Sequence, residues 1–325
     1  MLLRVRACML ICTTYLNVNL HLLLQTTYLI NHTHNMHSNP IYSHVQDRYG
    51  DLADRSSTIE QKKTEQNIAQ AFGYEAADLS SIPQAANLGV SCGNPLALAN
   101  LREGEAVIDL GSGGGIDVLL AAKKVGPKGK AIGVDMTKSM LELARKNAEK
   151  ADASNASFVE ASITSIPLPD RTATCIISNC VINLVPTVDK HLAFKEMFRL
   201  LEPGGRLAIS DILTRKELPQ DVINSLSFYV GCIAGASQVH EYEKYLSDAG
   251  FKDIAIVDTR SDLNIYKDLV QEQMDLGKTS DQSELGGCCG GPQGKNTAER
   301  NLLEYDFNEW AGESSRLFDC YTNTD

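Results

Sequence analysis

The chain has 325 residues, of which 43% are hydrophobic and 22% charged, so it can bury a full core and is neither fibrous nor disordered. Its formal net charge is -11 and no stretch is dense in Lys and Arg, which argues against nucleic acid or membrane as a partner and favours a small-molecule substrate. Nine cysteines without an even, close spacing indicate reduced thiols of an intracellular, cytoplasmic protein and not a disulfide scaffold.

The first 35 residues differ from the rest of the chain. Their only charged side chains are Arg4 and Arg6, and their longest apolar run, residues 7–12, is far shorter than the roughly 20 residues that span a bilayer. We expect residues 1–35 to be a disordered or non-native extension, with Met36 as an alternative start. A weak targeting signal is the other interpretation.

From residue 58 onward the chain shows regular secondary-structure patterns. Residues 58–72 contain good helix formers without Gly or Pro, which predicts a helical lead-in. Helices are also predicted after Thr137 as N-cap, over 189–201 until Pro203-Gly204-Gly205 stops the helix, and over 241–250. Short apolar runs between these helices predict buried strands over residues 106–110, 130–135, 157–161, 174–179, 206–213 and 251–259. The alternation predicts an α/β fold with a doubly wound, mostly parallel sheet.

The first strand runs into a glycine-rich turn, VIDLGSGGGIDVLL, over residues 107–120. A P-loop would need Gly-Lys-Ser/Thr after the turn, and a dinucleotide fingerprint would need a glycine at position 116, where this chain has Ile116. The acid Asp109 followed by Gly111, Gly113 and Gly115 resembles motif I of class I S-adenosylmethionine-dependent methyltransferases.

This resemblance implies S-adenosylmethionine as the cofactor. Glycines let the backbone approach the methionine part, Asp109 can anchor its ammonium group, and Asp135 at the end of the second strand can accept the ribose hydroxyls. The adenine is expected after the third strand. The expected cofactor-binding residues are Asp109, Gly111, Ser112, Gly113, Gly115, Asp135, Met136, Ser162, Ile163 and Asn179.

Three cysteines lie in unusual surroundings. Cys180 follows the strand 174–179, where the carboxyl ends of parallel strands line a ligand crevice, whereas Cys175 lies mid-strand and is expected in the core. Cys92 lies in the turn-rich GVSCGNP and Cys232 among the small residues of YVGCIAGA. Structural zinc is a rival for three thiols, but it usually brings paired ligands at short spacing and a fourth donor.

The segments GVSCGNP, the glycine turn, ISNCVINL and YVGCIAGA occur in this order, and over residues 36–258 the chain resembles arsenite methyltransferases. The resemblance implies that Cys92, Cys180 and Cys232 are the catalytic residues and hold As(III) beside the donor methyl group. Thiolates suit this soft centre, and transfer then depends on proximity and orientation, without a general base. Arsenite or its thiol conjugates are the implied substrates, with thioredoxin or glutathione as the reductant.

The resemblance also divides the chain. Residues 36–100 are expected to form a helical segment with an arsenic-binding loop, 101–258 the S-adenosylmethionine-binding domain, and 259–325 a C-terminal region with a Gly/Cys-rich loop. In that loop, Cys288 and Cys289 either capture arsenic or are incidental. After residues 308–312 few alternating hydrophobic residues remain, so a last strand is expected to be missing or altered.

Two other functions stay open on the sequence. A methyltransferase acting on carbon or oxygen of a small organic molecule, such as a quinone or sterol intermediate, would have no use for three converging thiols. A non-catalytic metalloid-binding protein would use the thiols but never consume the methyl donor.

Overall fold

The computed structural model describes residues 39–55, 59–264 and 316–321. The chain divides into two units, Met1–His44 and Val45–Asp325. Of the first unit only residues 39–44 are described, and they include the start of helix α2 (Pro40–Asp54). Within the described ranges, no helix combines the length and the apolar character that a bilayer crossing requires.

A seven-stranded sheet with the order β3-β2-β1-β4-β5-β7-β6 organises the second unit. The strands are β1 (Ala106–Leu110), β2 (Lys130–Asp135), β3 (Ala156–Glu160), β4 (Ala173–Asn179), β5 (Leu201–Asp211), β6 (Lys252–Asp258) and β7 (Arg316–Tyr321). Neighbouring strands from β3 through β5 are parallel, and β7 is antiparallel to β5 and to β6. This confirms the predicted α/β fold with a mostly parallel sheet.

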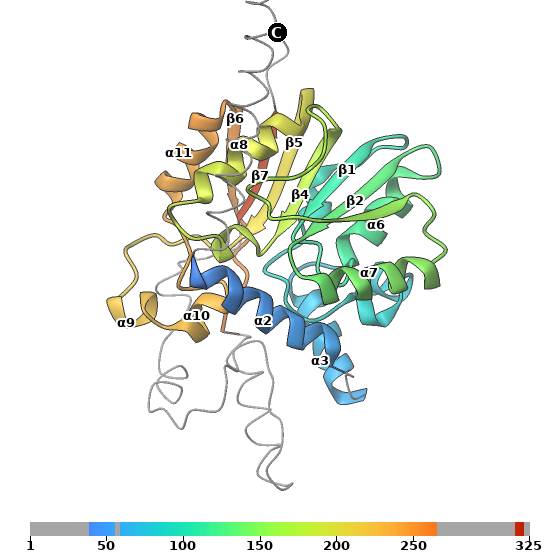
Figure 1. Ribbon diagram of the computed structural model, residues 1–325, viewed down its shortest axis with the longest axis horizontal. Helices are drawn as coiled ribbons and strands as arrows, with labels where there is room; N and C mark the ends of the chain where they lie inside the picture. Colours follow the sequence, from blue (N-terminus) through green and yellow to red (C-terminus); the bar gives the residue numbers. More distant parts are fainter. Residues whose placement is uncertain (1–38, 56–58, 265–315, 322–325) are drawn as a thin grey trace, which may run out of the picture. The chain divides into compact units, whose positions relative to one another are not determined.

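Helices pack on both faces of this sheet. The helices that follow α2 along the chain are α3 (Ile59–Ala71), α4 (Ala76–Ser80), η1 (Gln84–Ala86), α5 (Pro95–Ala99), α6 (Ile116–Val125), α7 (Lys138–Lys150), η2 (Ile182–Leu184), α8 (Lys190–Leu200), α9 (Gln220–Ile223), α10 (Leu226–Val230) and α11 (Val239–Ala249). Helices α8 and α11 bury Phe194 and Tyr242 in the core cluster on one face, and α5 and α6 bury Leu96 and Leu119 in the cluster on the other. Figure 1 shows α8 and α11 near β5 and β6, and α6 near β1 and β2.

Most predicted elements lie within a few residues of the observed ones, with one difference at the end of α8. The expectation that Pro203-Gly204-Gly205 terminates this helix is wrong, because the chain enters β5 at Leu201, directly after Leu200. The Pro-Gly-Gly segment instead lies inside β5, where the register with β4 shifts between Ala173 and Cys175. A bulge accommodates the turn-forming residues within the strand.

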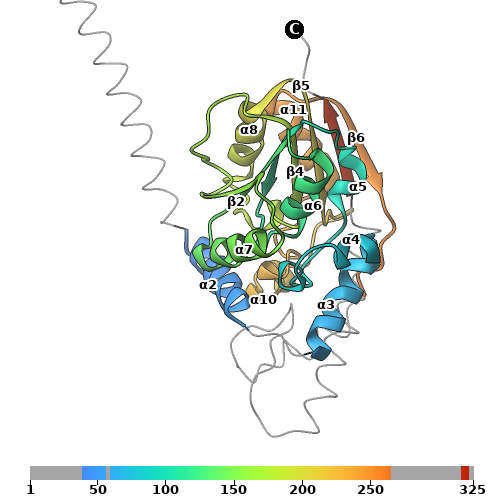
Figure 2. The ribbon, with the colours of Figure 1, turned by 90° about the vertical axis from the view of Figure 1, so that its right-hand side faces the viewer.

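The last strand is not missing: residues 316–321 form β7, so that part of the expectation is wrong. Strand β7 pairs through its backbone with β5, as at Leu207 and Cys320, and with β6, as at Ile256 and Phe318. An inserted strand forms hydrogen bonds along both edges, which supports pairing even where the alternation of apolar residues is weak. Figure 2 shows β7, in red, beside β6, in orange. The Gly/Cys-rich loop with Cys288 and Cys289 lies outside the described residues.

Candidate active site

The candidate site lies at the edge of the sheet where the parallel strands end. Asp135 closes β2, Asn179 closes β4 and Asp211 closes β5, while the glycine turn follows β1. Because parallel strands bring their carboxyl ends to one edge, these residues from distant parts of the sequence lie along the same edge of the sheet.

The glycine turn has a backbone that other residues rarely adopt. Gly111, Gly113 and Gly115 have φ of 70°, 49° and 93°. A Cβ atom on Gly111 would lie 2.2 Å from Cγ2 of Val181, whereas a Cβ on Gly113 would meet nothing closer than the Met140 sulfur at 4.0 Å. Packing against Val181 therefore requires glycine at position 111, whereas Gly113 has open space beside it.

Three buried carboxylates surround the turn. Asp109 at the end of β1 is 3% exposed, and no hydrogen bond reaches its side chain within the described part of the chain. Burial raises the pKa of Asp109, and the charges of Asp117 and Asp135 raise it further. Among the described residues, no Lys, Arg or His forms an ion pair with any of the three. Such a cluster favours a cationic ligand.

Asp135 is tied into the turn through its backbone. Its two carboxylate oxygens accept hydrogen bonds from the N–H groups of Gly113, at 3.0 Å, and Thr137, at 2.8 Å. Burial raises the pKa of this carboxyl, while these backbone donors lower it. The buried hydroxyl of Ser112, in the same turn, has no hydrogen-bond partner among the described residues. The turn therefore retains polar groups for a ligand.

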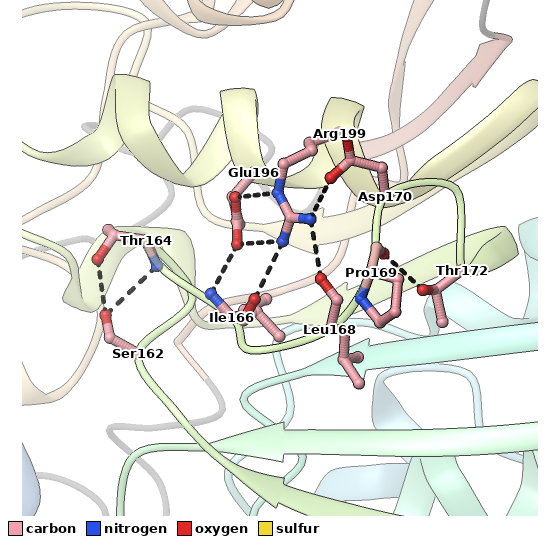
Figure 3. A network of polar contacts seen from close by, with 9 residues as sticks. All are labelled: Ser162, Thr164, Ile166, Leu168, Pro169, Asp170, Thr172, Glu196 and Arg199. Carbon is pink, nitrogen blue, oxygen red and sulfur yellow. Dashed lines mark hydrogen bonds and ion pairs between the residues drawn. The ribbon is translucent and has the colours of Figure 1, made fainter. Parts of the chain in front are cut away.

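The loop after β3 carries Ser162 and Ile163, both at least nine-tenths buried. Figure 3 shows how α8 holds this loop: the Arg199 guanidinium donates to the carbonyls of Ile166, at 3.0 Å, and Leu168, at 2.8 Å. Glu196 pairs with Arg199 and accepts from the N–H of Ile166 at 2.6 Å. The loop expected to face the adenine is thus held in place by two charged side chains of one helix.

Three cysteine sulfurs meet at the same edge of the sheet. The Sγ atoms of Cys92, Cys180 and Cys232 all lie within 4.8 Å of one another, and all three residues are buried. Cys92 and Cys180 are joined by a disulfide with a Cα–Cα distance of 5.4 Å, and the Cys232 thiol donates to the carbonyl of Cys180 at 2.9 Å. The expectation of reduced thiols is wrong for Cys92 and Cys180, because their two segments meet at the end of β4, and it holds for Cys232, which forms no disulfide with another described cysteine.

The cluster lacks the donor set of a structural zinc site. No fourth His, Cys, Asp or Glu ligand atom joins the three sulfurs anywhere in residues 39–55, 59–264 and 316–321, whereas structural zinc almost always has four ligands. Cys175 is fully buried in the core cluster next to Ile177, which confirms the expectation that it is a packing residue. Three sulfurs without a fourth donor suit a thiophilic centre with three bonds.

A hydrogen-bonded group that the sequence analysis missed connects the glycine turn to the Cys92 loop. The Tyr74 hydroxyl donates to Asp117, in the first turn of α6, at 2.8 Å. The Asn179 amide donates to the Tyr74 oxygen at 2.8 Å and to the carbonyl of Gly93 at 2.9 Å. Burial raises the pKa of Asp117 to about 6, and the hydrogen bonds from Tyr74 and Asn179 oppose the shift. The sequence signal that could have revealed this group was Asp117, an acid two residues after the last glycine of the turn.

Known proteins resemble this chain in sequence. Residues 101–250 match a family model described as a methyltransferase domain. The chain is 44% identical over 194 residues to a Halobacterium salinarum protein named arsenite methyltransferase, covering 60% of this chain and 49% of that protein. It is 32% identical over 225 residues to a protein of the same name from Aquipseudomonas alcaligenes, covering 67% of this chain and 64% of that protein. The chain thus spans about half the length of the first relative and under two thirds of the second.

A solved structure shares the fold. Haemonchus contortus phosphoethanolamine N-methyltransferase 2, solved in complex with S-adenosyl-L-methionine, has a TM-score of 0.53 at 16% identity. The likeness covers 85% of this chain and 60% of that one. At this identity it shows the fold alone.

Proposed function

We propose that the chain is a class I S-adenosylmethionine-dependent methyltransferase that transfers methyl groups from S-adenosylmethionine to thiol-bound As(III), producing methylated arsenicals. The methyltransferase-domain model that matches residues 101–250 and the order of the strands in the sheet support the first part of this proposal. The observation that carries this proposal is the meeting of three buried sulfurs at the edge of the sheet that also carries the acid-lined glycine turn. Both relatives described above are named for this activity.

The residues of the turn suit the cofactor. When bound, S-adenosylmethionine supplies an electrophilic methyl group. The buried Asp109 carboxylate would pair with the ammonium group, and the free lone pairs of Asp135 would accept the ribose hydroxyls. The remaining members of the proposed cofactor set are Gly111, Ser112, Gly113, Gly115, Met136, Ser162, Ile163 and Asn179. The excess of buried negative charge supports a ligand that carries positive charge.

The three sulfurs suit the substrate. Thiolates bind soft centres such as As(III) in preference to hard ions. Three thiolates bound to As(III) leave its lone pair free to accept the methyl group, and holding the pair toward the donor favours transfer by proximity and orientation. A quinone- or sterol-type acceptor would leave these sulfurs without a role.

A disulfide between two of the three cysteines would balance the electrons of the reaction. Adding a methyl cation to As(III) gives As(V), which must gain two electrons before a second methyl group can add. Two thiolates can supply these electrons by forming a disulfide, and the Cα–Cα distance of 5.4 Å between Cys92 and Cys180 allows that bond. We propose thioredoxin or glutathione as the dithiol or thiol that restores them, with the cytoplasm as the reducing compartment.

The test is a labelling experiment. The reduced protein is incubated with arsenite, a thiol and S-adenosylmethionine labelled in its methyl group, and mass spectrometry identifies the labelled products. We expect label on arsenic, at least about a hundredfold less with Cys92→Ser, Cys180→Ser or Cys232→Ser, and near-normal activity with the matched control Cys175→Ser. Full activity in all three site variants would reject the assignment. Arsenite binding without consumption of the donor would instead indicate sequestration.

A further inference from the structure

Lys190, the first residue of α8, is a lysine with no exposed surface. Its ammonium group donates to the carbonyl of Gly235 and, at 2.8 Å, to the hydroxyl of Ser237. Both acceptors lie in the loop that follows Cys232. Burying an ammonium group is costly unless it is paired and hydrogen-bonded, so this arrangement needs a reason in the surrounding structure.

A buried acid accompanies this lysine. One carboxylate oxygen of Asp211 accepts a hydrogen bond from the Asn183 amide at 2.8 Å, and the other has no partner among the described residues. Burial raises the pKa of Asp211 to about 7 and lowers that of Lys190 to about 8, and each charge opposes the shift of the other.

The same loop is pressed against the segment that follows Cys180. A Cβ atom on Gly235 would lie 1.9 Å from the carbonyl oxygen of Asn183, so only glycine fits there. Asn183 lies three residues after Cys180, and Lys190 lies ten residues after it. The contacts of Lys190 therefore attach the Cys232 loop to the Cys180 segment.

The backbone of both cysteines needs such support. Cys180 and Cys232 have φ of 64° and 65°, in the left-handed region that non-glycine residues rarely adopt. A residue held there is strained and persists only when surrounding contacts fix it. The hydrogen bonds from the Lys190 ammonium group are such contacts. Their acceptors, Gly235 and Ser237, lie three and five residues after Cys232.

We propose that Lys190 is a positioning residue that holds the Cys232 sulfur within bonding distance of the As(III) shared with Cys92 and Cys180. The role of Lys190 in arsenic binding rests on the proposed function. The attachment of the Cys232 loop to Lys190 through Gly235 and Ser237 is independent of that function. The two parts can therefore be tested separately.

The geometric part is tested by crosslinking. In a Cys92→Ser background, which leaves Cys180 without its disulfide partner, dibromobimane joins pairs of neighbouring thiols, and peptide mass spectrometry quantifies the Cys180–Cys232 bridge. Lys190→Met keeps an unbranched side chain, one heavy atom shorter, and removes its charge and donors. We expect the bridge to form about tenfold more slowly in this variant, since its rate depends on proximity.

A control and a milder variant keep the test decisive. Lys123 on α6 also donates to a backbone carbonyl, that of Ser81 at 2.6 Å, but at an exposed position, so Lys123→Met removes a lysine–carbonyl contact elsewhere and should leave the crosslinking rate unchanged. Ser237→Ala removes one acceptor of Lys190 and should slow the bridge about threefold. If Lys190→Met fails to fold, the crosslinking rate of Ser237→Ala tests the positioning role instead.

Arsenic coordination provides the second readout. With Cys92 present and reduced, X-ray absorption should give three As–S bonds in the parent protein and two in Lys190→Met, with unchanged binding of S-adenosylmethionine. Bridge formation at the parent rate in both Lys190→Met and Ser237→Ala would overturn the positioning role. Slower bridge formation in a protein whose parent never labels arsenic would leave the positioning role standing and reject the proposed function.

Discussion

The side-chain oxygen of Asn179 accepts a hydrogen bond from the backbone N–H of Cys92 at 3.2 Å. The amide nitrogen of the same side chain donates to the carbonyl of Gly93 at 2.9 Å. Asn179 directly precedes Cys180, so one side chain attaches the loop of the first cysteine to the segment of the second. These contacts account for the approach of two sulfurs that lie 88 residues apart in the sequence.

Replacing Asn179 should separate these two cysteines. Asn179→Ala leaves the buried N–H of Cys92 and the carbonyl of Gly93 without their partner, and we expect a loss of about 1–3 kcal/mol in the free energy of unfolding. Formation of the Cys92–Cys180 disulfide with oxidised glutathione should slow about tenfold. The matched control is Asn155→Ala, which removes amide hydrogen bonds to the carbonyls of Ala122 and Gly126. Equal oxidation rates in the two variants would contradict this role.

The residues that sequence reasoning identified and those it missed differ in kind. Asp109 and Asp135 could be identified because they lie at or next to the last residue of predicted strands beside a recognisable glycine turn, and the parallel topology fixes where such residues gather. The roles of Tyr74 and Lys190 could not be predicted from the sequence, because their hydrogen-bond partners depend on how helices and loops pack on the sheet. The pairing of β7 was missed for a similar reason: hydrogen bonds to two existing strands leave no pattern in the six residues that form them.

Gly113→Ala should separate folding from cofactor binding. The residue has φ of 49°, and its added Cβ would meet nothing closer than 4.0 Å, so we expect a modest loss of about 1 kcal/mol in unfolding free energy. The methyl group would occupy the open space beside the turn, and we expect binding of S-adenosylmethionine to weaken at least about tenfold, measured by calorimetry.

The matched control for this variant is Gly104→Ala. Gly104 has φ of 86°, and nothing lies within 4 Å of an added Cβ, so it has a similar backbone cost at an exposed position away from the turn. Its affinity for the cofactor should equal that of the parent. Equal weakening in both variants would mean that strain in the fold, and not the space beside Gly113, controls binding.

Arg199 should affect the cofactor through the loop it holds. Arg199→Met removes the donors to Ile166 and Leu168, and we expect KM for S-adenosylmethionine to rise about tenfold with a smaller change in kcat. Arg206→Met is the control, because Arg206 also donates to two carbonyls, those of Ala99 and Asn100, and pairs with Glu105. Both variants should lose stability in urea, but only Arg199→Met should raise KM. A rise of the same size in both would assign the effect to general loosening of the fold.

The charge on Asp117 should cost stability at neutral and higher pH. The folded-state pKa of about 6 lies above the ordinary value of 3.8, so the folded state binds the proton more tightly than the unfolded state does. The stability that this proton contributes is fully present below about pH 4 and is lost as the pH rises through about 6. At about 1.4 kcal/mol for each step of one in pKa, the full cost of ionisation is about 3 kcal/mol.

Asp117→Asn should therefore stabilise the fold in a pH-dependent way. The amide oxygen can still accept the hydrogen bond from Tyr74, and the variant carries no charge to bury. We expect urea unfolding to give a gain of about 2 kcal/mol at pH 8 and little or none at pH 4. Asp47→Asn, at an exposed position on α2, should change stability by less than about 0.5 kcal/mol at either pH. A gain that is equal at pH 8 and pH 4 would show that relief of a buried charge is not its cause.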